Sequence, residues 1–267
     1  MGLLLSPVAA REVVHLLILQ ELSGVRGGDV VTVKGGVNLR LFFQSVRYSE
    51  DIDLDGIPDA SSAIRGCIKG IFRDRALLLR LRRMGIRGLD PGEGPNKDTE
   101  TTFRYKFGVL VGGVRHPTKV EVSYRDPYPG DRAVLEATDA RLVSRYGMEP
   151  IPARRYVREA AIRQKIDALG GRNQVQARDV FDLHALGAGA ADVDLLSFLA
   201  GGLGRSRLEE SYKRALEITY GEYEGQVLEF LEADARARYG SESAWDEIRL
   251  EAADLIERVM KHGEEAE

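Results

Sequence analysis

The sequence predicts an α+β protein, in which a mixed sheet with helices comes first and an α-helical lobe follows. Two observations support this prediction. Short β-branched or alternating apolar segments, which are typical of strands, occur only before residue 150. After residue 154, apolar residues recur at helical spacing in one segment after another. We therefore expect an α/β lobe at residues 1–150 and a helical lobe at residues 151–267.

The elements of the N-terminal lobe follow from apolar periodicity and from glycine and proline breaks. Val13, Leu16 and Leu17 share one face of the first helix. Val120 and Val122 alternate with polar residues, as in a half-buried strand. The predicted elements are a helix at 7–22, a strand at 29–33, a helix at 37–43, a strand at 52–55, a long basic helix at 58–84, a loop at 90–98, and a hairpin of strands at 101–111 and 114–124.

The elements of the second lobe are predicted from helical spacing alone, with glycine-rich breaks between segments. Helices are expected at 155–169, 176–186, 194–199, 206–219, 223–238 and 244–261. Residues 261–267 are expected to fray.

The composition indicates a protein of a reducing compartment. The single cysteine, Cys67, excludes an internal disulfide. No apolar run reaches the roughly 20 residues that a membrane-spanning helix needs. The N-terminal leucines lack the basic segment that opens a signal peptide. We therefore expect a soluble, cytoplasmic protein with no membrane partner.

Charge is distributed unevenly along the chain, whose net charge is −4. Residues 61–180 carry 24 basic and 14 acidic side chains, whereas residues 181–267 carry 9 basic and 20 acidic ones. A basic segment of this kind fits an enzyme that binds a polyanion such as RNA. It equally fits an arginine-rich protein with solvated charged faces.

A glycine pair followed by closely spaced acids is the most informative pattern in the chain. Gly35 and Gly36 open a predicted helix, whose free N–H groups can bind a phosphate. Lys34, directly before them, can add a positive charge. Taken alone, a glycine pair before a helix is most often just a tight turn.

The acids Asp51 and Asp53 lie on the strand that follows this helix. Because side chains alternate along a strand, Asp51, Asp53 and Asp55 should point to one face. Neighbouring carboxylates repel each other unless a cation lies between them, and such hard oxygen ligands suit Mg²⁺ or Mn²⁺. Glu121, between two valines of a predicted strand, is a third candidate ligand. The competing interpretation is a set of solvent-exposed acids, with Glu121 as an edge-strand charge against aggregation.

A second constellation lies in the helical lobe. Asp179 and Asp182 are three residues apart and so share one face of a helix, and Lys165 lies on the helix before it. An antiparallel helix pair would bring the three side chains together. Lys165 could then be a phosphate ligand, or it could lock two helices in a buried salt bridge. Both interpretations hold together if an aspartate positions the lysine.

Four segments together resemble one protein family. K-G-G-V-N-L-R-L at 34–41 and R-Y-S-E-D-I-D-L at 47–54 are similar to the signature of the AbiEii/AbiGii-type toxin nucleotidyltransferases. These include the MenT toxins and belong to the DNA polymerase beta-like nucleotidyltransferase superfamily. A-I-R-Q-K-I-D-A-L at 161–169 and A-R-D-V-F-D-L at 177–183 resemble two further segments of the family, in the right order.

The resemblance implies a transferase that moves a nucleoside monophosphate from an NTP to an acceptor with the help of Mg²⁺ or Mn²⁺. Asp51 and Asp53 would hold the metal ions, and Glu121 would take the place of the third carboxylate. Ser49 matches a serine that helps to hold the triphosphate, next to the helix opened by Gly35 and Gly36 and preceded by Lys34.

In the helical lobe, the resemblance implies that Lys165 contacts the phosphates and that Asp179 or Asp182 completes the active site across a cleft. The implied partners are an antitoxin and, as acceptor, the 3′ end of a tRNA. A protein hydroxyl and a small molecule are alternative acceptors.

One position departs from the family pattern. The family usually carries a small hydroxyl residue after the glycine pair, where this chain has Val37. The departure removes one phosphate contact and favours an alternative, a non-catalytic module that binds a nucleotide or an antitoxin. The presence of Asp51, Asp53 and Lys165 favours the enzyme.

Overall fold

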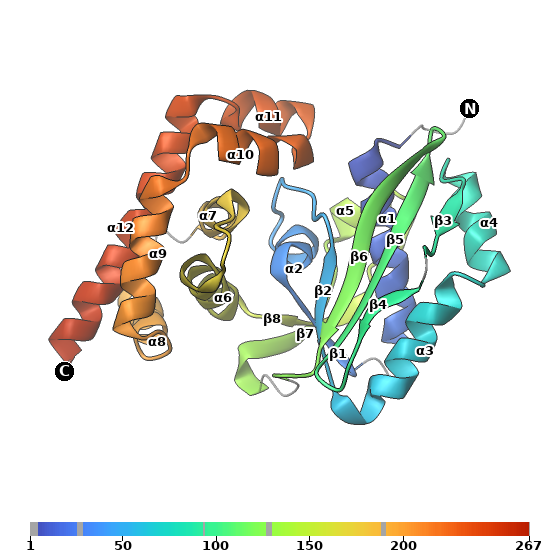
Figure 1. Cartoon of the computed structure of the whole chain (residues 1–267), viewed down its shortest axis with the longest axis horizontal. Helices are drawn as coiled ribbons and strands as arrows, with labels where there is room; N and C mark the ends of the chain where they lie inside the picture. Colours follow the sequence, from blue (N-terminus) through green and yellow to red (C-terminus); the bar gives the residue numbers. More distant parts are fainter. Residues whose placement is uncertain (1–4, 26–28, 93, 127–129, 188–190, 267) are drawn as a thin grey trace. The chain divides into compact units, whose positions relative to one another are not determined.

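The computed structural model describes residues 5–25, 29–92, 94–126, 130–187 and 191–266. The chain divides into two compact units (Figure 1). The first comprises Met1–Gln44 and Tyr48–Tyr156, and the second comprises Ser45–Arg47 and Val157–Glu267. The sheet lies in the first unit and the second is built of helices, so the predicted α+β class is confirmed.

The first unit contains one mixed sheet with helices. Its elements are α1 (Pro7–Ser23), β1 (Val31–Lys34), α2 (Gly35–Phe42), β2 (Ile52–Gly56), α3 (Ser61–Ile71), α4 (Arg75–Arg83), β3 (Gly88–Asp90), β4 (Pro95–Asp98), β5 (Thr102–Val111), β6 (Val114–Ser123), β7 (Ala133–Ala137), α5 (Ala140–Ser144) and β8 (Pro152–Tyr156).

The strand order is β3-β5-β6-β2-β1-β8-β7, and β4 pairs with the same edge of β5 as β3 does, nearer the start of that strand. The hairpin β5–β6 is antiparallel over its whole length, as the sequence predicted. β2 pairs in parallel with β6 on one side and antiparallel with β1 on the other. β2 therefore lies in the interior of the sheet, where its side chains are held by neighbours on both sides.

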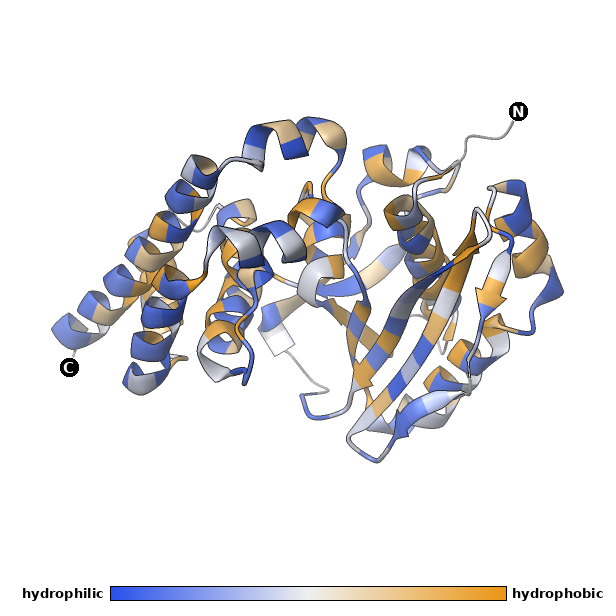
Figure 2. Cartoon of the chain, turned by 45° about the horizontal axis from the view of Figure 1, so that its top comes forward, coloured by the Kyte–Doolittle hydropathy of each residue, from blue (hydrophilic) through white to orange (hydrophobic). Residues whose placement is uncertain are grey.

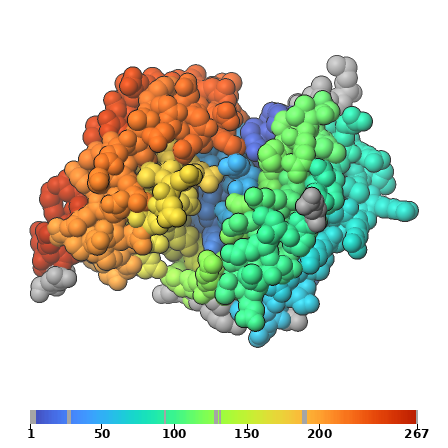
Figure 3. Space-filling view, in the orientation of Figure 1, coloured from blue at the N-terminus to red at the C-terminus, as the bar shows by residue number. Residues whose placement is uncertain are grey.

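The sheet has one apolar and one polar face. Along β5 and β6, hydrophobic and hydrophilic residues alternate (Figure 2). Phe103, Phe107 and Val120 are fully buried on the apolar side, whereas Lys106 is exposed and Lys119 partly exposed on the other. The green atoms of the hairpin lie at the surface of the first unit in Figure 3. Alternation therefore leaves a row of charged side chains on one side of these strands.

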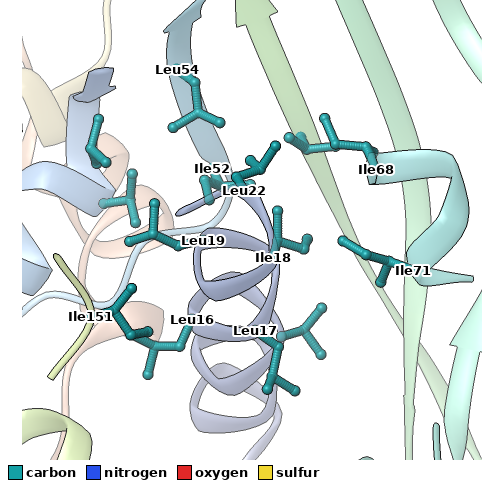
Figure 4. Close-up of a cluster of buried hydrophobic side chains, with 14 of the residues drawn as sticks. Leu16, Leu17, Ile18, Leu19, Leu22, Ile52, Leu54, Ile68, Ile71 and Ile151 are labelled. Carbon is teal, nitrogen blue, oxygen red and sulfur yellow. The ribbon is translucent and has the colours of Figure 1, made fainter. Parts of the chain in front are cut away.

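The core of the first unit forms around α1, which contacts α3, β5, β6 and β8. Leu16, Leu17, Ile18 and Leu19 are consecutive and all buried, so α1 is surrounded on every side rather than on the one face that its spacing predicted (Figure 4). Ser6 caps the helix by accepting a hydrogen bond from the Ala9 N–H. Because α1 packs against β5, β6 and β8, it determines which face of the sheet is buried.

The structure corrects three predicted elements of this unit. The long basic helix at 58–84 is two helices, α3 and α4, because Asp74 caps a new start by accepting hydrogen bonds from Ala76 N–H and Leu77 N–H. The predicted loop at 90–98 contains β4 and the end of β3, both paired with β5. Residues 155 and 156, predicted as the start of a helix, belong instead to the strand β8, because pairing with β1 and β7 overrides local propensity.

The second unit contains the remaining helices. They are α6 (Arg158–Gly171), α7 (Ala177–Ala185), α8 (Val193–Ala200), α9 (Arg205–Glu217), α10 (Tyr220–Gln226), α11 (Ala233–Tyr239) and α12 (Glu242–Ala266). The single helix predicted at 223–238 is wrong, because α10 and α11 are separated by the 3-10 turn Leu228–Phe230. Trp245 is buried and stacks on Tyr223 with ring centroids 4.4 Å apart.

α12 continues to Ala266, so the predicted fraying from residue 261 is wrong for the residues that the structure describes. Within that part of the chain, none of the helices combines the length and the apolar character that crossing a membrane requires.

A buried histidine ties α1 to the sheet. His15 is 1% exposed, and its Nε2 lies 2.8 Å from Thr118 Oγ1. The Thr118 hydroxyl donates its own proton to the carbonyl of Glu50, so we assign the Nε2–H tautomer to His15. Burial lowers the pKa of His15 from 6.5 to about 4. The imidazole is therefore neutral in the folded chain at neutral pH.

This pKa shift predicts a specific loss of stability in acid. Because the folded-state pKa lies below the unfolded value, protonation of His15 favours unfolding as the pH falls through the window from 6.5 to about 4. Between pH 7 and pH 5 the free energy of unfolding should fall by about 2 kcal/mol through this residue. Hydrogen exchange of α1 amides measures it. In His15→Gln, which can still donate to Thr118, that part of the pH dependence should vanish; an unchanged dependence would contradict the assignment.

Candidate active site

Three charged side chains share one level of the polar face of the sheet. Asp53 on β2 lies opposite Glu121 on β6 in the parallel register, and opposite Lys34 on β1 in the antiparallel one. Arg104 on β5 continues the same row beyond Glu121. Residues paired across strands point to the same side. The sheet register therefore brings together residues that are as many as 87 positions apart in sequence.

Lys119 lies between the two aspartates that the sequence singled out. Its Nζ is 2.7 Å from Asp51 Oδ2 and 4.0 Å from Asp53 Oδ1. Its backbone N–H donates to Asp51 Oδ1 at 3.1 Å. The sequence analysis missed Lys119, although its position two residues before Glu121 on β6 puts both on one face. The ammonium group of Lys119 thus lies within 4.0 Å of the carboxylates of both Asp51 and Asp53.

Among these charged side chains, the carboxylate of Asp53 is the one whose negative charge is least offset by positive neighbours. Desolvation and the neighbouring charges of Asp51 and Glu121 raise the pKa of Asp53, although Lys119 and Lys34 oppose the shift. At Glu121 burial alone would raise the pKa, but Arg104, whose Nε is 2.5 Å from Glu121 Oε2, lowers it overall. Asp53 is the carboxylate with the least compensation.

The residues present fit a hard cation between Asp51 and Asp53. Both are oxygen donors, and the ammonium of Lys119 shows that a positive charge can be placed between them. Glu121 is engaged by Arg104. Within the described ranges, no three side chains of the acidic, histidine or cysteine type are grouped closely enough to hold a metal ion. The candidate donor set is therefore the pair Asp51 and Asp53.

The start of α2 lies against this pair. Gly35 has a φ of +66°, and a Cβ at this position would lie 3.2 Å from Asp53 Oδ2. Glycine is required here both by the left-handed backbone and by the close approach of the carboxylate. Val37, two residues later, is 2% exposed and belongs to the core of the first unit. The side chain at that position therefore packs rather than binding an anion.

Two further residues that the sequence assigned to nucleotide binding are engaged within the protein. Lys34 Nζ is 2.6 Å from Asp55 Oδ1, and the Tyr156 hydroxyl donates to Asp55 Oδ2 at 2.8 Å. The Ser49 hydroxyl donates to the carbonyl of Asp51 at 2.7 Å. Asp55 is buried and holds Lys34 in place. Ser49 closes the turn before β2.

A second charged cluster lies inside the helical unit. Lys165 on α6 reaches Asp179 Oδ1 at 2.9 Å and Asp182 Oδ2 at 2.5 Å, both on α7. Arg47 contacts both oxygens of Asp182 at 2.8 Å, and Arg172 Nη1 lies 2.9 Å from Asp179 Oδ2. Both aspartates are fully buried and Lys165 is nearly so. The helix pair thus unites the lysine and the two acids that the spacing had placed on facing helices.

Arg47 opens the segment at 47–54 that resembles the family signature, but its pairing with Asp182 was not predicted. It is 135 residues from Asp182 and lies outside the helical segments, so no local pattern could reveal the pair. Burial alone would raise the pKa of Asp182, but Arg47 and Lys165 lower it overall. The carboxylate is therefore charged in the folded unit and depends on its cationic partners.

Removing one member of this cluster should unfold the helical unit more readily. In Asp182→Ala, Arg47 and Lys165 lose a buried partner, and such a break costs about 3–5 kcal/mol. Fluorescence of Trp245, the only tryptophan of the chain, follows this unit in urea. The control is Asp167→Ala on α6, an exposed acid paired with Arg207, for which we expect less than about 1 kcal/mol. Equal losses in both variants would refute this account.

Gly35→Ala should destabilise the first unit. An L-residue with a left-handed backbone costs about 1–2 kcal/mol, and the new Cβ would also press on Asp53. The matched control is Gly66→Ala in α3, where a Cβ meets nothing within 4 Å and helix propensity should rise by up to about 1 kcal/mol. Hydrogen exchange of β1 and β2 amides distinguishes the two, and a stabilised Gly35→Ala would rule out the argument.

Known proteins agree with this architecture. Among solved structures, JHP933 from Helicobacter pylori is similar at a TM-score of 0.57 and 22% identity, covering 98% of this chain and 96% of that one. MenT4, a nucleotidyltransferase toxin from Mycobacterium tuberculosis H37Rv, is similar at a TM-score of 0.56 and 17% identity, covering 97% and 89%. At these identities the likeness shows the fold alone. No curated protein matches the chain significantly.

The family model described as nucleotidyl transferase AbiEii toxin, type IV TA system, matches residues 17–251. This range includes the β2 aspartates, Glu121 and the Lys165 cluster. The chain therefore belongs to the AbiEii family of toxin nucleotidyltransferases.

Proposed function

We propose that this protein transfers a nucleoside monophosphate from an NTP to a hydroxyl acceptor, with Asp51 and Asp53 as the ligands of a divalent cation. The observation that carries the proposal is the pair itself. Two carboxylates at the start of β2 flank one positive charge, beside a helix that opens with a left-handed glycine. Family membership supports the transferase class. Mg²⁺ and Mn²⁺ both suit the oxygen donors.

The reaction balances as a displacement at phosphorus. The acceptor oxygen forms a bond to the α-phosphorus while the bond from that phosphorus to the oxygen bridging the β-phosphate breaks. Pyrophosphate leaves, and the proton of the acceptor hydroxyl passes to water. A divalent ion held by Asp51 and Asp53 would neutralise charge on the phosphoryl oxygens and orient the reacting groups. Asp53 has the least compensated carboxylate, so a cation there would relieve repulsion from Asp51 and Glu121.

Phosphate binding in this proposal uses the protein's own cations and the start of α2. Free N–H groups at the helix start favour an anion. Lys34 is held by Asp55, and Ser49 shapes the turn, so both would support the triphosphate from fixed positions. Glu121, the proposed third carboxylate, would act through its pairing with Arg104 or, once released, as a further ligand.

For the helical unit we propose that Lys165 contacts substrate phosphates. Its ammonium has three donors, of which Asp179 and Asp182 engage two, so the group is oriented and retains one donor. A lysine fixed in this way is a preorganised ligand. In this proposal Asp179 and Asp182 position Lys165. Arg172 is 42% exposed and can extend the same cationic group.

The acceptor we propose is the 3′ end of an RNA such as a tRNA, and the partner we propose is an antitoxin encoded with the protein. The family description names a toxin of a toxin–antitoxin system, which supports the second part. The excess of ten basic over acidic side chains in residues 61–180 supports a polyanionic acceptor.

The competing function is a non-catalytic module that binds a nucleotide or an antitoxin. Val37 favours it, because a core valine replaces a phosphate-binding hydroxyl. Asp51 and Asp53 favour the enzyme, because closely spaced carboxylates can hold the divalent cation that phosphoryl transfer uses.

The decisive variants are Asp51→Asn and Asp53→Asn. Incubation of the whole protein with α-labelled NTP, Mg²⁺ and total RNA should give labelled RNA, and each variant should lose at least about a hundredfold in rate. EDTA should abolish labelling, and Mn²⁺ should restore it. Because its charge is poorly compensated, Asp53→Asn should not lower the melting temperature.

The control is Asp98→Asn, a surface carboxylate of β4 paired with Arg65 and Lys69, which should label RNA at the wild-type rate. Labelling that persists in Asp51→Asn would disprove the assignment. NTP-dependent thermal stabilisation without any labelling of RNA, protein or small molecules would support the binding module instead.

A further inference from the structure

A cavity opens beside Asp51 on the hairpin side of the acids. It has a volume of about 350 Å³, and Lys106, Arg115, Pro117 and Lys119 of the hairpin line it together with Asp51. This size lies within the range of small-ligand sites, about 300–1,000 Å³. All of these residues belong to the first unit. The cavity therefore exists without any contribution from the helical unit.

The register of the hairpin explains why three cations meet there. Lys106 lies opposite Lys119, Gly108 opposite Pro117, and Leu110 opposite Arg115, so their side chains share the polar face. Gly108 leaves room for a neighbour: a Cβ at this position would lie 2.5 Å from Arg115 Cγ. The arginine side chain thus lies flat across β5 and reaches Asp90 Oδ2 on β3 at 2.6 Å.

Three cations and two carboxylates, Glu50 and Asp51, line this cavity, so its net charge is positive and suits an anion. Lys119 serves Asp51, and Arg115 serves Asp90 with both side chains more than 40% exposed. Lys106 is exposed and forms no ion pair with any residue in the described part of the chain. An exposed ion pair such as Arg115–Asp90 is worth little, so a phosphate can compete for the guanidinium. The side chains are in place to bind phosphate without burying an unpaired charge.

The position of the cavity relative to the acids indicates which substrate it holds. In the sheet, β2 with its acids lies between β1 and β6. Lys34 is the last residue of β1, and α2, whose start is the proposed phosphate site, begins directly after it. The cavity lies on the other side of β2, on β6 and β5. In an in-line displacement, the attacking and leaving oxygens lie on opposite sides of the phosphorus. If pyrophosphate leaves on the β1 side, the acceptor must enter from the hairpin side.

We propose that the polar face of the β5–β6 hairpin binds the acceptor, with Lys106, Arg115 and Lys119 contacting the backbone phosphates of a single-stranded nucleic-acid 3′ end. This inference rests on the proposed nucleotide transfer and adds the surface that presents the attacking hydroxyl. Lys119 pairs with Lys106, and Arg115 pairs with Leu110, four residues further along β5. The two pairs are therefore about 13 Å apart along the strand. A chain of phosphates can contact both levels at once, whereas an isolated protein hydroxyl offers no anion to either.

The test measures binding and transfer separately on the full chain. The probe is a single-stranded hexaribonucleotide with a fluorophore at its 5′ end and a free 3′ hydroxyl. Its affinity, by anisotropy between 50 and 200 mM salt, should fall with a log–log slope of about −0.7 for each phosphate contacted. Lys106→Gln and Arg115→Gln should each make the slope shallower by about 0.7 and together weaken binding about tenfold at 50 mM salt.

Two matched variants control for charge and folding. Lys106→Arg keeps the charge and should keep the slope. Arg75→Gln removes an exposed cation at the start of α4, and should leave the affinity and the slope unchanged. In the transfer assay, Lys106→Gln should raise the KM for RNA severalfold and leave the KM for NTP unchanged.

The outcomes separate this inference from the proposed function. Slopes that are the same in wild type, Lys106→Gln and Arg115→Gln would overturn the acceptor surface, even if nucleotide transfer is confirmed. A raised KM for NTP instead of RNA would overturn it as well, since the cavity would then hold the triphosphate. Transfer that is absent in the wild type refutes the proposed function, while the binding slopes still decide whether the hairpin contacts phosphates.

Discussion

The parallel, in-register pairing of β2 with β6 is the constraint on which the rest of the candidate site depends. It places Asp53 beside Glu121 and brings Lys119 to Asp51 and Asp53. A shift of one residue would turn every one of these side chains to the opposite face. The apolar side of the same strands prevents that shift, because Ile52, Leu54 and Val120 are fully buried in the core around α1. Burial of the apolar side chains on one face of β2 and β6 therefore fixes which charged side chains lie together on the other face.

Three aspartates at alternate positions have three different environments. Asp51 is held by the backbone and side chain of Lys119, and Asp55 by Lys34 and the Tyr156 hydroxyl. Asp53 has a longer approach of Lys119, at 4.0 Å, and the more distant charge of Lys34, and its pKa is raised. A protein selected for stability alone would not place an uncompensated carboxylate between two others. This imbalance supports the proposed role of Asp53 as a ligand of a cation.

Sequence patterns predicted what depends on local spacing. The helix at the N-terminus, the Gly–Gly turn of the hairpin and the glycine that opens α2 were all visible, because burial periodicity and positive φ leave direct traces in the sequence. β8 and the break between α3 and α4 were not. β8 exists because β1 and β7 flank it, and its own residues include two arginines. Propensity carries no information about such neighbours.

The partners of the candidate residues were harder to predict than the residues themselves. Asp51, Asp53 and Lys165 belong to recognisable motifs and were assigned roles, whereas Lys119 lies outside them and Arg47, at the first position of the segment at 47–54, was assigned none. A sequence motif contains the positions at which only one type of side chain can perform the function. The counter-charges are set by three-dimensional contact, and a cation at any suitably placed position can supply them.

Arg47 shows how far such a partner can be separated from its site in the chain. Ser45–Arg47 belongs to the helical unit, whereas the chain before and after it belongs to the first unit. Arg47 is 3% exposed, bonds both oxygens of Asp182 and pairs with Leu231 through the backbone. A buried carboxylate with two cationic partners is costly to separate, so this short segment is fixed within the helical unit. Two residues after Arg47, Ser49 closes the turn onto Asp51 within the first unit. The Lys165 cluster and the pair Asp51 and Asp53 are therefore connected through a short covalent path, four positions along the chain from Arg47 to Asp51.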